Sequence, residues 1–154
     1  MKRRSFLKGT LAGSAVAVAA GAGLLSPRSV LAAWPESAFN AKSVSDAMDS
    51  LFGTADNKAS GDIKIKAPDI AENGAVVPVT VNTKIAGASA IAIIAEKNGQ
   101  PLAANFELAS NAKGTVSTRI KMGKTMDVIA VVKSGGKLYT ARKNVKVTIG
   151  GCGG

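Results

Sequence analysis

The chain has 154 residues, with 20 Lys and Arg against 10 Asp and Glu, and its formal net charge is +10. It contains one cysteine and no histidine, so it lacks the usual general base, the usual partner of a nucleophilic cysteine and the commonest metal ligand. The composition therefore argues against enzymes that depend on a histidine base and against metal centres with histidine ligands.

Residues 1–32 have the pattern of an export signal that is removed from the mature protein. The basic start contains Arg3 and Arg4, residues 11–25 are apolar, and Val30 and Ala32 occupy the −3 and −1 positions of a cleavage site. This pattern is typical of the twin-arginine (Tat) route and predicts a periplasmic protein that crosses the membrane folded. A stable membrane anchor is the weaker alternative, because the apolar stretch is rich in Ala and Gly and a cleavage site follows it.

Removal of the signal lowers the charge of the chain. The signal holds five basic residues and no acidic ones, so the formal net charge falls from +10 to +5. Only 4% of the residues are aromatic, and the remaining lysines are dispersed along the sequence. These features argue against nucleic acid as a partner and favour small anions or acidic proteins.

Residues 33–60 are predicted to form a lead-in and one short helix. Residues 33–42 are expected to be loosely structured. Ser43 followed by Asp46 has the spacing of a helix start, and Gly53 fits the position just past a helix end. We expect the helix to cover an end or edge of a sheet, with docking of a partner as the alternative, and residues 54–60 to form a polar loop. The apolar face of the helix consists of Val44, Ala47, Met48, Leu51 and Phe52.

From residue 61 onward the apolar residues recur with a period of two, which is typical of strands. Pro78 cannot donate a ladder hydrogen bond, so its strand is predicted to lie at an edge or to start with a bulge. Asn98 and Gly99 predict a tight hairpin turn with positive φ values, and residues 134–137 predict another turn. The predicted strands cover residues 63–66, 77–82, 90–96, 104–108, 116–121, 127–133 and 138–149.

About seven short strands separated by turns predict a mainly β domain over residues 61–149. The strand number and spacing favour an immunoglobulin-like antiparallel β-sandwich with a short N-terminal amphipathic helix. The Cys–Trp–Cys core pattern of antibody domains is absent.

Residues 150–154 read Gly-Gly-Cys-Gly-Gly and directly follow the last predicted strand. Glycine has no Cβ, so we expect these residues to form a flexible arm. A single cysteine in an exported protein indicates intermolecular pairing or a reactive thiol. The alternative is an incidental cysteine on a frayed terminus, which the glycines on both sides of Cys152 disfavour.

The sequence neighbours of Cys152 do not activate its thiol. A free cysteine has a pKa of about 8.5, and the nearest basic residue is Lys146. We therefore expect a partner enzyme to activate the thiol. A thiol that depends on partners in this way is typical of a carrier, which holds its substrate covalently. Two alternatives are a binding or adhesion module tethered by an intermolecular disulfide at Cys152, and a thiol enzyme, which the absence of histidine disfavours.

Three stretches of the sequence together resemble one family. They are the terminal Gly-Gly-Cys-Gly-Gly, the segment of residues 68–79 (PDIAENGAVVPV) and the twin-arginine signal. They resemble the SoxY family, the sulfur carriers of the Sox sulfur-oxidation system. The resemblance covers the whole chain, and the terminal pentapeptide is its most specific part.

The resemblance implies a carrier and not an enzyme. Cys152 would be the covalent attachment residue, Gly150, Gly151, Gly153 and Gly154 the arm, and the carrier would have no metal or haem. It also implies a heterodimer with SoxZ, a second β-sandwich. The implied enzyme partners are the c-type cytochrome SoxAX, which joins thiosulfate to the cysteine, and the manganese-dependent hydrolase SoxB, which releases sulfate. A sulfane dehydrogenase, where present, would oxidise the remaining sulfur.

Overall fold

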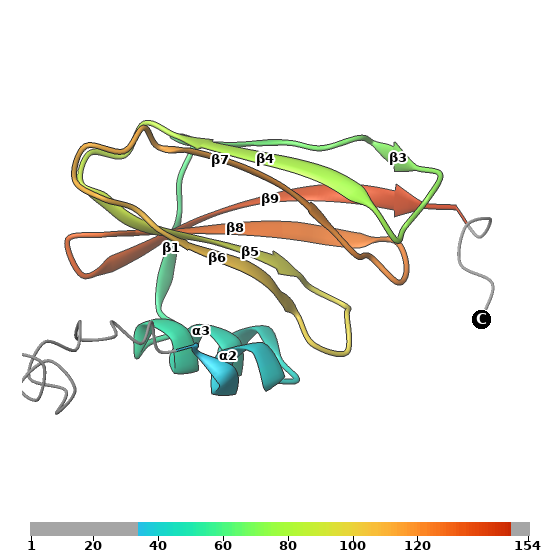
Figure 1. Cartoon of the computed structure of the whole chain (residues 1–154), viewed down its shortest axis with the longest axis horizontal. Coiled ribbons are helices and arrows are strands. Elements are labelled where there is room, and N and C mark those ends of the chain that lie inside the picture. The colour runs from blue at the N-terminus through green and yellow to red at the C-terminus, as the bar shows by residue number, and fades with distance from the viewer. Residues whose placement is uncertain (1–33, 149–154) are drawn as a thin grey trace, which may run out of the picture. The chain divides into compact units, whose positions relative to one another are not determined.

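A computed structural model describes residues 34–148, in which two helices precede a set of strands (Figure 1). The helices are α2 (Glu36–Asn40) and α3 (Val44–Phe52). The strands are β1 (Asn57–Ala59), β2 (Ile63–Lys66), β3 (Ile70–Ala71), β4 (Val77–Thr83), β5 (Ala88–Ala95), β6 (Leu102–Glu107), β7 (Thr115–Ile120), β8 (Met126–Ser134) and β9 (Lys137–Val147).

The strands form two sheets that lie one above the other (Figure 1). The larger sheet has the order β1-β9-β8-β5-β6, with β3 also paired to β9, and the smaller has the order β2-β4-β7. Most pairs are antiparallel, whereas the short strands β1 and β3 run parallel to β9. The predicted mainly β sandwich is therefore confirmed, with two short parallel pairings at one edge.

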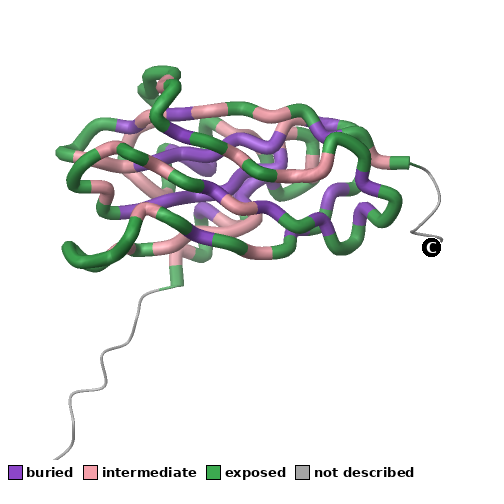
Figure 2. Tube along the Cα trace, turned by 90° about the horizontal axis from the view of Figure 1, so that it is seen from above, coloured by how far each residue is buried: buried purple, intermediate pink, exposed green. Residues whose placement is uncertain are grey.

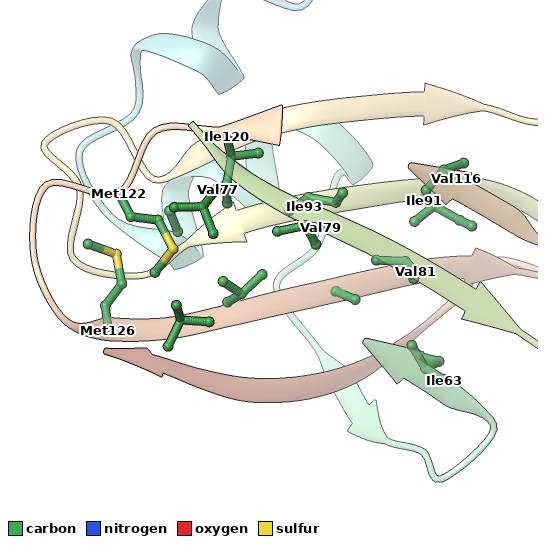
Figure 3. Close-up of a cluster of buried hydrophobic side chains, with 14 of the residues drawn as sticks. Ile63, Val77, Val79, Val81, Ile91, Ile93, Val116, Ile120, Met122 and Met126 are labelled. Carbon is green, nitrogen blue, oxygen red and sulfur yellow. The ribbon is translucent and has the colours of Figure 1, made fainter. Parts of the chain in front are cut away.

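The main core lies between the two sheets. Val77, Val79 and Val81 of β4 are at most 1% exposed, because alternate residues of a strand point to one face. Figure 3 shows these side chains packed against Ile91 and Ile93 of β5. Burying one Val or Ile side chain contributes about 1.5–3 kcal/mol. Buried and exposed positions alternate along the chain in Figure 2.

A second core lies between the helices and the opposite face of the larger sheet. Ala47 and Met48 of α3 pack there with Ile94 of β5 and Val131 of β8. β5 and β8 are thus buried on both faces, which explains why their sequences are continuous apolar runs rather than alternating ones. The helix therefore covers a face of the sheet, and the prediction that it covers an end or edge is wrong.

The predicted ends of α3 are confirmed. The Asp46 amide donates to the Ser43 hydroxyl at 3.1 Å, and Gly53 has a left-handed φ of 79° as it donates to the Asp49 carbonyl at 2.8 Å. These contacts satisfy backbone groups that a helix end leaves unpaired.

The regions before and after α3 contain regular structure that the sequence did not predict. The lead-in includes the five-residue helix α2, and the predicted polar loop includes β1. Both elements are stabilised by tertiary contacts: Ala38 of α2 is fully buried, and Asn57 of β1 pairs with Leu138 of β9.

Two turn predictions have different outcomes. Gly135 and Gly136 have φ values of 55° and 75°, which confirms a tight turn between β8 and β9. Asn98 and Gly99 have no positive φ, so the predicted tight turn is wrong there, and β5 and β6 are joined by the longer segment 96–101. Its Asn98 side chain makes long-range hydrogen bonds instead, as described below.

The prediction that Pro78 belongs to an edge strand is wrong. β4 is the central strand of the smaller sheet, and Pro78 pairs with Arg119 of β7. The pairing of β4 with β2 ends at Thr80, opposite Lys66. Pro78 thus lies where β4 has a neighbour on one side only, which is why its missing amide proton is tolerated.

Candidate functional site

The predicted site residues Cys152, Gly150, Gly151, Gly153 and Gly154 lie outside the described residues. The structure does describe the point from which they continue, at Thr148 after the end of β9. We call the part of the domain around Val147 and Thr148 the arm root.

The arm root is fixed by three hydrogen bonds that come from two sides of β9. The Lys146 amide donates to the Asp69 carbonyl at 3.0 Å, and the Thr148 amide donates to the Ala71 carbonyl at 3.1 Å. From the other side, the Val147 amide donates to the Thr125 hydroxyl at 3.0 Å. Because these bonds extend to Thr148, the last described residue before the predicted arm has a defined position on the domain.

The segment from Ile70 to Val76 wraps around the end of β9. Ile70 is in register with Lys146. Gly74 approaches so closely that a Cβ added to it would lie 2.8 Å from Cγ1 of Val147 and would meet the Met122 carbonyl oxygen. The Gly74 carbonyl also accepts a hydrogen bond from the Met122 amide at 2.7 Å. Glycine is therefore required at position 74 by close contact and not by a left-handed φ.

The connection between β7 and β8, residues 121–125, is held against the arm root from the far side. The Asn98 side chain donates to the Lys121 carbonyl at 2.7 Å and accepts from the Gly123 amide at 3.1 Å. The same connection supplies Thr125 to β9. Met122 and Met126 lie at this end of the main core (Figure 3).

Charged side chains near the arm root are partly paired. Lys143 forms an ion pair with Asp69 at 3.0 Å, and Arg142 forms one with Glu96 at 2.8 Å, on the neighbouring part of β9. No ion pair within residues 34–148 involves the exposed lysines 121, 124 and 146. The end of the domain that carries the arm therefore has unpaired positive charge.

The described residues contain no group of three or more metal-ligating side chains. None of the helices in this part of the chain is long and apolar enough to cross a membrane. A shallow hollow between the β4–β5 and β6–β7 connections lies at the other end of the sandwich and includes Lys84, Ser89 and Leu108. None of the residues that line it is acidic or a cysteine.

The family model described as "Sulfur oxidation protein SoxY" matches residues 48–152, which is more than half of the chain and includes Cys152. The chain belongs to the SoxY family. The sulfur carrier protein SoxY from Chlorobium limicola f thiosulfatophilum is similar in structure, with 49% sequence identity and a TM-score of 0.62. The match covers 68% of this chain and 94% of the Chlorobium chain.

A superoxide reductase (neelaredoxin) from Ignicoccus hospitalis is also similar in structure, with a TM-score of 0.50 and 20% identity. That match covers 56% of this chain and 80% of the other, and at this identity it indicates a shared fold only. No curated protein matches the chain.

The sequence indicates the SoxY family but not the surroundings of the predicted arm. It indicates no role for Asn98 beyond a turn and none for Gly74 or Thr125. The three residues come from separate segments, which meet only because the sheets place them beside β9. The close approach of Gly74 to β9 leaves no signal in a single sequence.

Proposed function

We propose that the chain is a covalent carrier of periplasmic sulfur oxidation, which holds sulfur intermediates on the thiol of Cys152. The observation that carries this proposal is the SoxY match over residues 48–152, because it spans both the sandwich and the only cysteine of the chain. The similar Chlorobium protein is described as a sulfur carrier, which supports the same role.

Loading of the carrier is an oxidation. The Cys152 thiol and the sulfane sulfur of thiosulfate form a disulfide bond, giving a cysteine S-thiosulfonate, and one proton and two electrons leave. The electrons pass to a haem cytochrome of the SoxAX type. Water then attacks the terminal sulfonate sulfur in a SoxB-type hydrolase, which releases sulfate and leaves a persulfide on Cys152. A sulfane dehydrogenase, where present, oxidises that persulfide.

The fixed arm root supports different roles for the domain and the arm. The domain holds Thr148 by the hydrogen bond to Ala71, and Gly150 and Gly151 follow with no side chains. A chain without side chains fits a narrow active-site channel and adopts many backbone conformations. The thiol can therefore be presented to several enzymes, each of which supplies the chemistry that the carrier lacks.

The proposed setting follows from the N-terminal signal and the family. Residues 1–32 direct export by the twin-arginine route, the mature chain pairs with a SoxZ-like subunit, and the carrier acts without a cofactor of its own. Transfer of a folded protein lets the two subunits cross the membrane together.

Intact-mass measurement of the protein purified from its native host tests this function. We expect adducts with the mass of sulfane sulfur or of a thiosulfonate group, present on Cys152 and removed by a reductant. A second SoxZ-like chain is expected to copurify. Protein found only as an unmodified thiol or as a disulfide-linked adhesion module, under conditions of active thiosulfate oxidation, would contradict the proposal.

Replacing both Gly150 and Gly151 with Val is expected to slow sulfate release from the loaded carrier by roughly tenfold, because β-branched residues restrict the backbone and misplace the cargo. The fold should be unaffected. The rate is measured with SoxB-type hydrolase and loaded carrier. The control introduces two valines at the exposed Ser110 and Asn111, in the β6–β7 connection at the other end of the sandwich. Equal rates for both variants would show that the glycines do not act as an arm.

A further inference from the structure

The length of the arm limits the distance between the domain and an enzyme that reacts with the Cys152 thiol. Cys152 is four residues beyond Thr148, the last described residue. A fully extended chain spans at most about 3.3–3.6 Å per residue, so the cysteine Cα lies within about 14 Å of the Thr148 Cα. An enzyme that reacts with the thiol inside a recessed site must therefore contact the domain around the arm root.

Two exposed apolar side chains belong to the short segment that packs against the end of β9. Among the described residues, only Trp34, Ile70 and Val76 are large hydrophobic side chains that are mostly exposed. Ile70 is 57% exposed and Val76 is 50% exposed, and both belong to the segment that wraps around the end of β9. Exposed apolar groups that gather at one place are typical of an interaction surface.

Positive charge borders these two residues. Lys146 is in register with Ile70, and Lys121 and Lys124 belong to the connection that contacts Gly74 and β9. All three lysines are exposed and unpaired within the described residues, whereas Glu72 is the one exposed acid of the wrapping segment from 70 to 76. A surface of this kind is complementary to an apolar opening with an acidic rim.

We propose that Ile70, Val76, Lys121, Lys124 and Lys146 form a docking surface for the enzymes that process the cargo on Cys152. Its occupant is the mouth of an enzyme active-site channel, apolar at its centre and acidic at its rim. The inference rests on the proposed carrier function. The apolar pair supplies close contact, and the lysines raise the rate of encounter with the acidic rim.

Two pairs of substitutions test this docking surface in the complete mature carrier with its partner subunit. One pair is Ile70→Ser with Val76→Ser, and the other is Lys124→Glu with Lys146→Glu. The control pair is Lys64→Glu with Lys66→Glu, which makes the same charge change at exposed positions of β2 in the smaller sheet. Each loaded protein is given to a SoxB-type hydrolase, and sulfate release is measured against carrier concentration.

Both docking-surface pairs are expected to lower kcat/KM for sulfate release by about tenfold or more, mainly through KM. The effect of the charge pair is expected to shrink in about 1 M salt, where the Debye length is about 3 Å. The control pair is expected to stay within about twofold of the unmodified carrier. Alkylation of Cys152 by iodoacetamide, a small neutral reagent, is expected to stay unchanged in all variants, which separates docking from thiol reactivity.

Normal kcat/KM in both docking-surface pairs would overturn the inference and leave the proposed carrier function intact. Absence of sulfate release from the unmodified loaded carrier would overturn both. Loss of the SoxZ-like subunit, or of a carrier dimer, from the docking-surface variants would show that another chain occupies the surface and would also overturn the inference.

Discussion

Cys152→Ser is expected to reduce carrier-dependent thiosulfate oxidation to the rate measured without any carrier. A serine hydroxyl forms no bond equivalent to a disulfide, so neither loading nor any later step can occur on it. The chain has no second cysteine to replace the lost thiol. The measurement is cytochrome reduction by thiosulfate in a system reconstituted from the carrier and its partner enzymes.

The stability of the Cys152→Ser protein serves as the control. Position 152 lies beyond the hydrogen bonds that fix Thr148, so the free energy of unfolding is expected to change by less than about 0.5 kcal/mol. A fully active Cys152→Ser carrier would remove the basis of the carrier proposal, whereas an inactive but normally folded one supports it.

Gly74→Ala is expected to lower the free energy of unfolding by about 2–4 kcal/mol, because overpacking combines with the strain or loss of a hydrogen bond. The new Cβ would meet the Met122 carbonyl oxygen, which is backbone and cannot rotate away, and would lie 2.8 Å from Cγ1 of Val147. The wrapping segment must therefore move away from β9. Urea unfolding followed by circular dichroism measures the change.

Gly61→Ala is the matched control for this substitution. A Cβ added to Gly61 would have no atom within 4 Å, and Gly61 has no positive φ. Its stability is expected to stay within about 0.5 kcal/mol of the unmodified protein or to rise slightly through reduced entropy of the unfolded chain. Equal effects of the two substitutions would contradict the close packing of Gly74 against β9.

Much of the sandwich could be predicted from local sequence patterns. Period two identified β2, β4 and β7, because each has one buried and one exposed face. The continuous apolar runs of β5 and β8 also predicted strands. The position of the helices over the second face of these strands was not predicted. Local signals were sufficient wherever burial of one face determines the structure.

The elements that were missed are short and depend on distant partners. β1 and β3 have three and two residues, and both exist as strands because they pair in parallel with β9. The Asn98-Gly99 pair resembled a turn, but the Asn98 side chain is used to hold the connection of residues 121–125. Such contacts join segments more than 20 residues apart and leave no periodic pattern.

The chemistry assigned to Cys152 stays a prediction from the sequence, and the surroundings of the arm root could not be predicted. A lone cysteine between glycines, with no histidine in the chain, indicated a thiol that other proteins activate. The apolar and basic residues around the arm root are separated in the sequence, from Ile70 to Lys146. The pairing of β3 with β9 and the hydrogen bonds of the connection 121–125 bring them together.

The position of β9 also has a mechanical consequence for a carrier that is held by its arm. A pull on Thr148 along the axis of β9 would place tension on the strand pairs that β9 forms. β9 is paired with β8 from Met126 opposite Val145 to Ser134 opposite Lys137, and with β1 and β3 on its other side. Hydrogen bonds in such ladders lie across the strands, so the tension shears them together instead of peeling them one at a time. The register therefore predicts that the sandwich resists a pull along β9 better than one directed across it.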